Sequence, residues 1–294
     1  MIKDYNECRL CPRECKINRN NGKIGFCGAT NFAEINRIAL HFMEEPVISG
    51  TKGSGTVFFT HCTMKCIFCQ NSEISRKESK GKIYSAENLA EEYIKLQELG
   101  AHNINLVSPT HYMPTIKESI YISKQKGIKI PFVYNTSGFE RAEIIKSLDG
   151  YIDIFLTDYK YFSPYLAKEF SNCEDYPDFI INSINEMINI TGSPVFDHNG
   201  ILKKGTIIRH LMLPNQIDDT LKILRNTEKN FKNNILFSLM RQYTPINLLP
   251  DELNRTINNY EYSLATAEFE ALGLEGFIQS NDSVGTDKIP DFDY

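Results

Sequence analysis

Short apolar runs alternate with longer segments of helical periodicity along most of the chain after residue 57. The runs are rich in β-branched and aromatic residues, which is typical of buried strands. We expect strands at 57–59, 103–107, 132–134, 152–156, 206–213 and 235–240, with a short last strand at 276–278. Apolar positions three and four apart predict helices at 85–100, 114–127, 140–148, 180–188, 221–231 and 250–273. Six such alternations predict an α/β fold with a parallel sheet, curved or closed as a partial (β/α)6 barrel.

Three segments do not follow this alternation. Residues 35–49 have a mixed pattern, and we expect them to pack an N-terminal module, 1–49, against a core formed by 50–294. The glycine-rich stretch 50–55 precedes a strand instead of joining a strand to a helix, so a phosphate-binding P-loop is not expected. The loop at 192–205 is rich in turn residues, and we expect an exposed turn, with a lid as the alternative.

Composition narrows the class of protein. Apolar residues make up 41% and charged residues 23%, as in ordinary globular proteins. The net charge of −5 argues against nucleic-acid or anionic-membrane partners, which need a basic surface. The chain has no run of about 18 apolar residues and no apolar core of a signal peptide near residue 1, so we expect a cytoplasmic protein. In that compartment its eight cysteines indicate metal or redox ligands before disulfides.

Three of these cysteines, Cys62, Cys66 and Cys69, lie on one short loop that follows the strand at 57–59. Three thiolates can bind three irons of a 4Fe-4S cluster and leave the fourth iron open to a small molecule. A zinc knuckle is the alternative, but structural zinc needs four ligands. His61 could be a fourth ligand only in a strained geometry, because it is adjacent to Cys62.

A second group of cysteines comes earlier in the chain. It consists of Cys8, Cys11, Cys15 and Cys27, with the turn-forming stretch 18–23 between the last two. Four thiolates can close a tetrahedral site, and the segment is too short to have an apolar core of its own. We therefore expect a bound metal here, either zinc or an auxiliary iron-sulfur cluster, with reduced surface thiols as the alternative.

The loop motif carries a family resemblance. Cys62-x3-Cys66-x2-Cys69, with Phe68 before the last cysteine, resembles the signature of the radical S-adenosylmethionine (SAM) superfamily. The resemblance implies a 4Fe-4S cluster whose open iron is chelated by SAM, with Phe68 beside the cofactor. It also implies an electron donor such as flavodoxin or ferredoxin, and cleavage of SAM to methionine and a 5′-deoxyadenosyl radical that abstracts hydrogen.

In such a barrel the chemistry gathers at the carboxyl ends of the strands. Ser108 and Thr110 follow the second strand, where the family usually carries Gly-Gly-Glu, and we expect their oxygens to hold the amino group of SAM. Asn135 and Ser137 close the third strand and resemble the ribose-facing turn of the family. Either pair could also be ordinary turn residues.

Charged residues follow the next two strands. Asp158 and Lys160 project from one side of an extended chain and resemble a SAM-contacting pair of glycyl-radical activating enzymes, with a solvated ion pair as the alternative. Arg209 lies in an apolar strand and needs an anionic partner. The resemblance suggests the SAM carboxylate, and Asp153 is the structural alternative.

Two further residues, His111 and Tyr243, are candidates for catalytic groups, with loop and core roles as the alternatives. Residues 8–27, 62–75, 157–160 and 209–214 together resemble the pyruvate formate-lyase activating enzyme-like branch, in a form with an N-terminal four-cysteine module. This implies a radical SAM enzyme that abstracts hydrogen from a protein glycine or a small molecule. The alternative is a non-catalytic iron-sulfur or zinc protein for electron transfer or metal binding.

Overall fold

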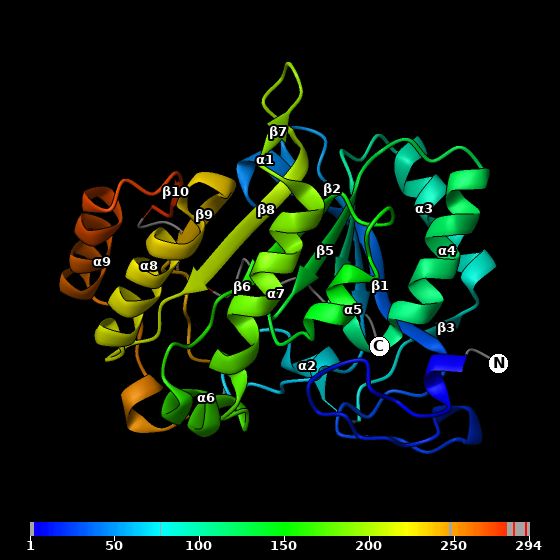
Figure 1. Ribbon diagram of the computed structural model, residues 1–294, viewed down its shortest axis with the longest axis horizontal. Helices are drawn as coiled ribbons and strands as arrows, with labels where there is room; N and C mark the ends of the chain where they lie inside the picture. The colour runs from blue at the N-terminus through cyan, green and yellow to red at the C-terminus, as the bar shows by residue number, and fades with distance from the viewer. Residues whose placement is uncertain (1–2, 77, 247–248, 281–284, 286–291, 293–294) are drawn as a thin grey trace.

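The computed structural model describes residues 3–76, 78–246, 249–280, 285 and 292. Its central feature is a parallel sheet whose six main strands are neighbours in chain order (Figure 1). These strands are β2 (Ser54–Phe59), β4 (Ile104–Val107), β5 (Phe132–Thr136), β6 (Ile154–Asp158), β8 (Leu202–Leu211) and β9 (Ile235–Met240). The expected α/β fold with a partial (β/α)6 barrel is confirmed, because each crossover between these strands carries a helix.

Additional strands extend the sheet at both ends. The short strand β10 (Gly276–Ile278) pairs in parallel with β9, as predicted. At the other end, β1 (Ala33–His41) pairs antiparallel with β2, and β3 (Lys82–Tyr84) pairs with β1. The sequence pattern predicted no strand within 35–49. This is wrong for the first half of the segment, which forms a strand of the main sheet. The helix α1 (Pro46–Ser49) follows it, and the proposed division at residue 49 stays a prediction.

Helices cover the outer face of the sheet (Figure 1). They are α3 (Ala86–Glu98), α4 (Met113–Gln125), α5 (Ala142–Lys146), α6 (Pro164–Ser171), α7 (Tyr176–Thr191), α8 (Ile217–Phe231) and α9 (Asn259–Ala271). Single turns occur at α2 (Ser72–Ser75), η1 (Lys3–Tyr5), η2 (Arg19–Asn21), η3 (Thr110–Tyr112), η4 (Lys232–Asn234) and η5 (Asp251–Leu253). No described helix is long and apolar enough to cross a membrane.

The last helix begins later than the sequence pattern predicts. Pro250 precedes only the turn η5, and α9 begins at Asn259. The Asn258 side chain accepts from the backbone N–H of Glu261, and the Glu261 carboxylate accepts from the backbone N–H of Asn258. This capping box satisfies two backbone donors of the first turn and so fixes the start of the helix.

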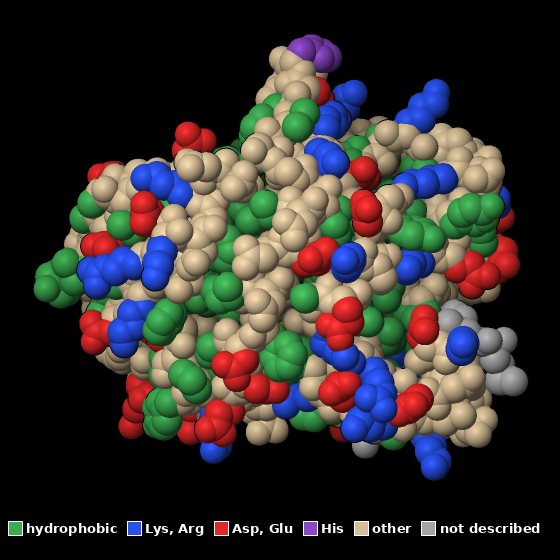
Figure 2. Space-filling model, viewed as in Figure 1, with side chains coloured by type: hydrophobic (Ala, Val, Ile, Leu, Met, Phe, Trp, Pro, Cys, Tyr) green, Lys and Arg blue, Asp and Glu red, His purple; other side chains and the backbone are tan. Residues whose placement is uncertain are grey.

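The loop at 192–205 forms a hairpin of β7 (Val195–Phe196) with β8. The hairpin projects from the amino-terminal end of β8 (Figures 1 and 2). Its tip is held by Asp197, whose carboxylate accepts from the backbone N–H groups of Asn199 and Ile201. It lies far from the carboxyl ends of the strands, so the alternative of a lid is wrong and the exposed turn is confirmed.

Residues 3–32 form loops that lie beside the carboxyl ends of the strands, near α2 (Figure 1). Three contacts attach this segment to the helices. The Tyr5 and Thr115 hydroxyls lie 3.2 Å apart, Glu14 pairs with Arg141 at 2.7 Å, and Arg13 donates to the Asn172 carbonyl at 2.6 Å. The segment is therefore fixed to α4, to the start of α5 and to the end of α6.

Candidate functional site

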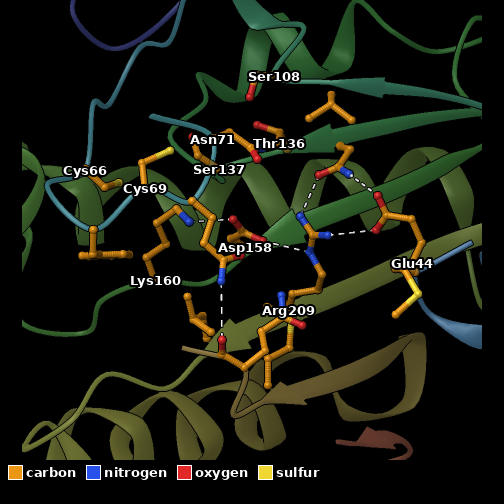
Figure 3. Close-up of a pocket in the computed structure, with 18 of the residues that line it drawn as sticks. Glu44, Cys66, Cys69, Asn71, Ser108, Thr136, Ser137, Asp158, Lys160 and Arg209 are labelled. Carbon is orange, nitrogen blue, oxygen red and sulfur yellow. Dashed lines mark hydrogen bonds and ion pairs between the residues drawn. The ribbon is translucent and has the colours of Figure 1, made fainter. Parts of the chain in front are cut away.

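The loop between β2 and α2 brings its three cysteines to one cavity. Cys62, Cys66 and Cys69 line a cavity of about 540 Å³ at the carboxyl ends of β4, β5, β6 and β8 (Figure 3). Parallel strands place their carboxyl ends at one edge, so the loop and the polar strand ends meet there. The volume is in the range of cofactor and small-molecule sites.

Backbone contacts hold the loop in its curved path. The Arg76 guanidinium donates to the carbonyls of Lys65 and Cys66, at 3.0 Å each. The backbone N–H of Met64 donates to the Cys62 sulfur at 3.3 Å, and the Ser75 hydroxyl lies 3.6 Å from the Cys69 sulfur. Such donors stabilise thiolates and tune the potentials of iron-sulfur centres.

His61 does not point toward the cysteines. One ring nitrogen lies 3.3 Å from the Glu34 carboxylate, and the other lies 3.1 Å from the Arg76 carbonyl. The sequence left open whether His61 is a fourth ligand of the loop. These contacts turn it away, and His61 is not among the residues that line the cavity.

Burial makes two of the loop thiols, those of Cys66 and Cys69, weaker acids. It raises the pKa of Cys69 to about 11, with the neighbouring Cys66 and Cys62 adding to the shift, and it also raises the pKa of Cys66. Metal binding here would therefore release protons. Among the described residues, no three His, Cys, Asp or Glu side chains converge as ligands of one ion. A cubane cluster needs no such convergence, because each thiolate binds a different iron. The positions of the loop thiols are therefore compatible with a cluster.

A network of buried charges lies opposite the cysteines (Figure 3). The guanidinium of Arg209 donates through Nε to Asp158 at 2.9 Å, through Nη1 to Glu44 at 3.2 Å and through Nη2 to Asn135 at 2.7 Å. The Arg209 side chain is 14% exposed and that of Glu44 is 11% exposed. Burial opposes ionisation of Asp158, but Arg209 and Lys160 outweigh it and lower the pKa of Asp158.

This network changes the interpretation of Arg209. Asp158 and Glu44 supply the anionic partners that a buried guanidinium needs, and three of its five N–H donors are engaged, so a contact of Arg209 with the SAM carboxylate stays a prediction. The structural alternative, Asp153, is wrong, because Arg209 pairs with Asp158 and Glu44, and the Asp153 carboxylate accepts from the backbone N–H of Phe132. The sequence analysis missed Glu44 as a site residue. The only signal in the sequence is the pair of acids, Glu44 and Glu45, directly before Pro46.

Lys160 has a different position in the network. Its ammonium lies 2.6 Å from Asp158, the one contact that it makes among the described residues, and its side chain is 17% exposed. An ammonium has three N–H donors, so two remain for a ligand. The hydroxyl of Tyr176 accepts from the Lys160 backbone N–H at 2.9 Å and fixes this end of β6.

The expected polar strand ends only partly reach the cavity. Ser108, Asn135 and Ser137 line it, together with Thr136. Ser108 has a φ of 56°, a conformation that favours glycine, at the place where the family usually has Gly-Gly-Glu. Thr110 does not line the cavity. Its hydroxyl donates at 2.5 Å to the buried carboxyl of Glu140, so the expected contact of Thr110 with SAM is not supported.

The two candidate catalytic residues lie outside the cavity lining. The ring of His111 is buried, bonds the Thr60 carbonyl at 2.7 Å and has its pKa lowered to about 3 by burial. The hydroxyl of Tyr243 donates to the Leu253 carbonyl at 2.7 Å. Both have structural partners, so a catalytic role has no support from their positions. Phe68 does line the cavity, and its ring packs against that of Tyr243 at 6.1 Å.

The four N-terminal cysteines form a separate group. Together they line a second, nearly closed cavity of about 20 Å³, beside His111. No cysteine of the chain forms a disulfide. Backbone N–H groups of Phe26 and Ala29 donate to the sulfurs of Cys15 and Cys27, at 3.5 Å each. The sequence pattern therefore brought four thiols to one place, as expected.

The profile of the radical SAM superfamily matches residues 56–227. The chain belongs to the radical SAM superfamily. An uncharacterized protein of Methanocaldococcus jannaschii is 30% identical over 251 residues, which cover 82% of this radical SAM protein and 67% of that one.

Two solved structures show the same fold. HydG, a maturase of the FeFe-hydrogenase, has a TM-score of 0.52 at 16% identity, with 76% of this chain and 51% of that chain covered. A radical SAM methyltransferase from Sphaerobacter thermophilus has a TM-score of 0.52 at 14% identity, with 80% and 68% covered. The chain thus spans about half the length of HydG.

Proposed function

We propose that this radical SAM protein binds a 4Fe-4S cluster through Cys62, Cys66 and Cys69 and binds SAM in the adjoining part of the same cavity. The observation that carries the proposal is that three thiols, a partly unpaired ammonium and the polar strand ends face one cavity of about 540 Å³. When bound, cluster and SAM supply one-electron cleavage of the sulfonium and a 5′-deoxyadenosyl radical able to take a hydrogen atom from a substrate.

The residues of the chain bind and orient these groups. Lys160 is the residue that meets the SAM carboxylate, because among the described residues its ammonium contacts Asp158 alone, whereas three side chains hold the guanidinium of Arg209. Ser108 and Asn135 supply polar contacts for the amino and ribose groups, and Ser137 and Phe68 complete this side of the cavity. Arg209 acts as a positioning residue that holds Asp158 and Asn135 in place.

The substrate approaches over an apolar rim. Phe42 and Met43 both line the cavity, and each is 55% exposed. Large apolar side chains that stay exposed beside a cavity are typical of contact surfaces. They favour a substrate with an apolar or polypeptide surface, such as a protein glycine, over a small hydrophilic molecule. A one-electron donor such as flavodoxin or ferredoxin would reduce the cluster.

The test is SAM cleavage by anaerobically reconstituted protein. With dithionite and SAM, the unaltered chain should release 5′-deoxyadenosine, which chromatography quantifies. Cys66→Ala should release none and should lose about four irons per chain. Cys173→Ala is the matched control, because Cys173 is a free, buried cysteine outside both groups. Protein that holds iron and sulfide but never cleaves SAM would contradict the proposal and favour a non-catalytic metal-binding or electron-transfer protein.

A further inference from the structure

Arg19 is a buried cation without an acid beside it. It is 1% exposed, and its guanidinium donates to the backbone carbonyls of His111, at 2.5 Å, and of Thr30. Its Nε has no partner, and no carboxylate pairs with it among the described residues. The rings of Tyr5 and Tyr112 lie 4.2 and 5.7 Å from it. A buried charge without a counter-charge is costly. Burial of the Arg19 guanidinium is therefore unfavourable unless an anion lies beside it.

The missing anion has a place next to Arg19. The residue lines the cavity of about 20 Å³ that Cys8, Cys11, Cys15 and Cys27 also line, and its Nη1 lies 3.9 Å from the Cys8 sulfur. As thiols these four groups carry no charge. As thiolates on a divalent ion they carry a net charge of about −2, which a guanidinium alongside partly compensates.

We propose that these four cysteines hold one thiophilic divalent ion, of which zinc is the probe, and that Arg19 is the counter-ion of this centre. Binding releases four thiol protons and forms four sulfur–metal bonds, with no change of oxidation state. A cavity of this size accommodates about one water-sized particle, which favours a single ion over an auxiliary cluster. The sulfurs are not yet converged on one point, so the ion would draw them inward.

The proposed centre is attached to the loop of the radical SAM site. Arg19 contacts the carbonyl of His111, whose ring bonds the Thr60 carbonyl at 2.7 Å. From the same cysteine segment, Arg13 donates to the Thr63 carbonyl at 3.2 Å. Thr60 and Thr63 flank Cys62 in the sequence. The centre therefore supports the backbone from which the cluster loop begins.

Metal analysis of the full chain tests the ion. In a background with Cys62, Cys66 and Cys69 all changed to alanine, purified protein supplied with zinc should retain about one zinc per chain. Adding Cys15→Ala should remove it, and adding Cys173→Ala should not. Because this background lacks the radical SAM ligands, the result is independent of the proposed catalytic function. Absence of zinc, or iron with sulfide in its place, would overturn the proposal.

Variants of Arg19 test the counter-ion. In zinc-loaded protein, Arg19→Met should lower zinc affinity, measured by chelator competition, by about tenfold or more, and Arg19→Lys should retain most of it. In protein that also lacks the four N-terminal cysteines, Arg19→Met should raise the melting temperature, because it removes an uncompensated charge. If Arg19→Met lowers the melting temperature by a similar amount in zinc-loaded protein and in protein without the four cysteines, Arg19 has a purely structural role and this assignment is overturned.

Discussion

The two cysteine groups differ in whether the cations beside them are paired with acids. The loop cysteines face a wide cavity in which Arg209 and Lys160 are balanced by Asp158 and Glu44. The N-terminal cysteines face a nearly closed cavity with Arg19, a cation that forms no ion pair with an acid among the described residues. The ion-paired network at the loop site can keep its geometry before a ligand binds, and an N–H donor that remains in it can bind that ligand. Arg19 has no paired acid in the described part of the chain, so its counter-charge would have to come from the metal-bound thiolates.

The difference suggests two separate roles. The loop site is open and polar, and the Lys160 ammonium has N–H donors left for a ligand, as catalysis requires. The N-terminal site is small and sits behind the cluster loop, as structural support requires. Three changes would break or sharpen this contrast.

The largest effect is expected for Arg209→Met. It leaves Glu44 buried without its cation and Asp158 paired with Lys160 alone, which should lower the free energy of unfolding by about 3–5 kcal/mol in urea titrations. Adding Glu44→Gln should recover part of the loss. The control is Arg225→Met, which breaks an exposed pair with Glu268 and should cost less than about 1 kcal/mol. Equal losses for the two arginines would contradict a preformed network.

The next effect concerns Glu140, a buried acid close to Cys11 that bonds Thr110 and Thr136. Burial raises its pKa from 4.5 to about 7. From pH 4.5 to 7 the unfolded chain therefore releases a proton that the folded chain keeps, so stability falls as the pH rises. Glu140→Gln should remove this fall.

Urea titrations at several pH values measure this effect. Relative to Glu140→Gln, the unaltered chain should lose about 3 kcal/mol of stability between pH 4.5 and 8. Glu143→Gln is the control, because Glu143 lies on the surface and pairs with Arg141. A stability difference that does not change with pH would show that Glu140 is ionised in the folded protein.

The smallest effect is expected for Lys160→Gln. It removes the ammonium assigned to the SAM carboxylate, and calorimetry should show SAM binding weakened by about 10- to 100-fold. Lys168→Gln, which breaks an exposed pair with Glu174, should leave SAM affinity unchanged. Unchanged SAM affinity after Lys160→Gln would show that another donor binds the SAM carboxylate. It would contradict the assignment of Lys160 as the ligand-binding cation and of Arg209 as the positioning residue.

The sequence by itself determined the fold class and the two cysteine groups. Alternating apolar runs and helical faces are local patterns, so the strands at 103–107, 132–134 and 235–240 were predicted close to their observed positions. Cysteines close in sequence must be close in space, and Cys62, Cys66 and Cys69 accordingly line one cavity. The pattern missed β1, because this strand pairs antiparallel with β2 and β3 and so lies outside the alternation of parallel strands and crossover helices.

Only the tertiary structure decided the partners of the charges. Sequence chemistry said that a buried Arg209 needs an anion, but the partners are Glu44 and Asp158, 165 and 51 residues away in the chain. Likewise, nothing near Arg19 in sequence shows that it is buried against a cavity lined by four thiols. Periodicity records which face of an element is buried. It does not record which side chain of another element lies opposite, because that depends on how the sheet curves and where each loop returns.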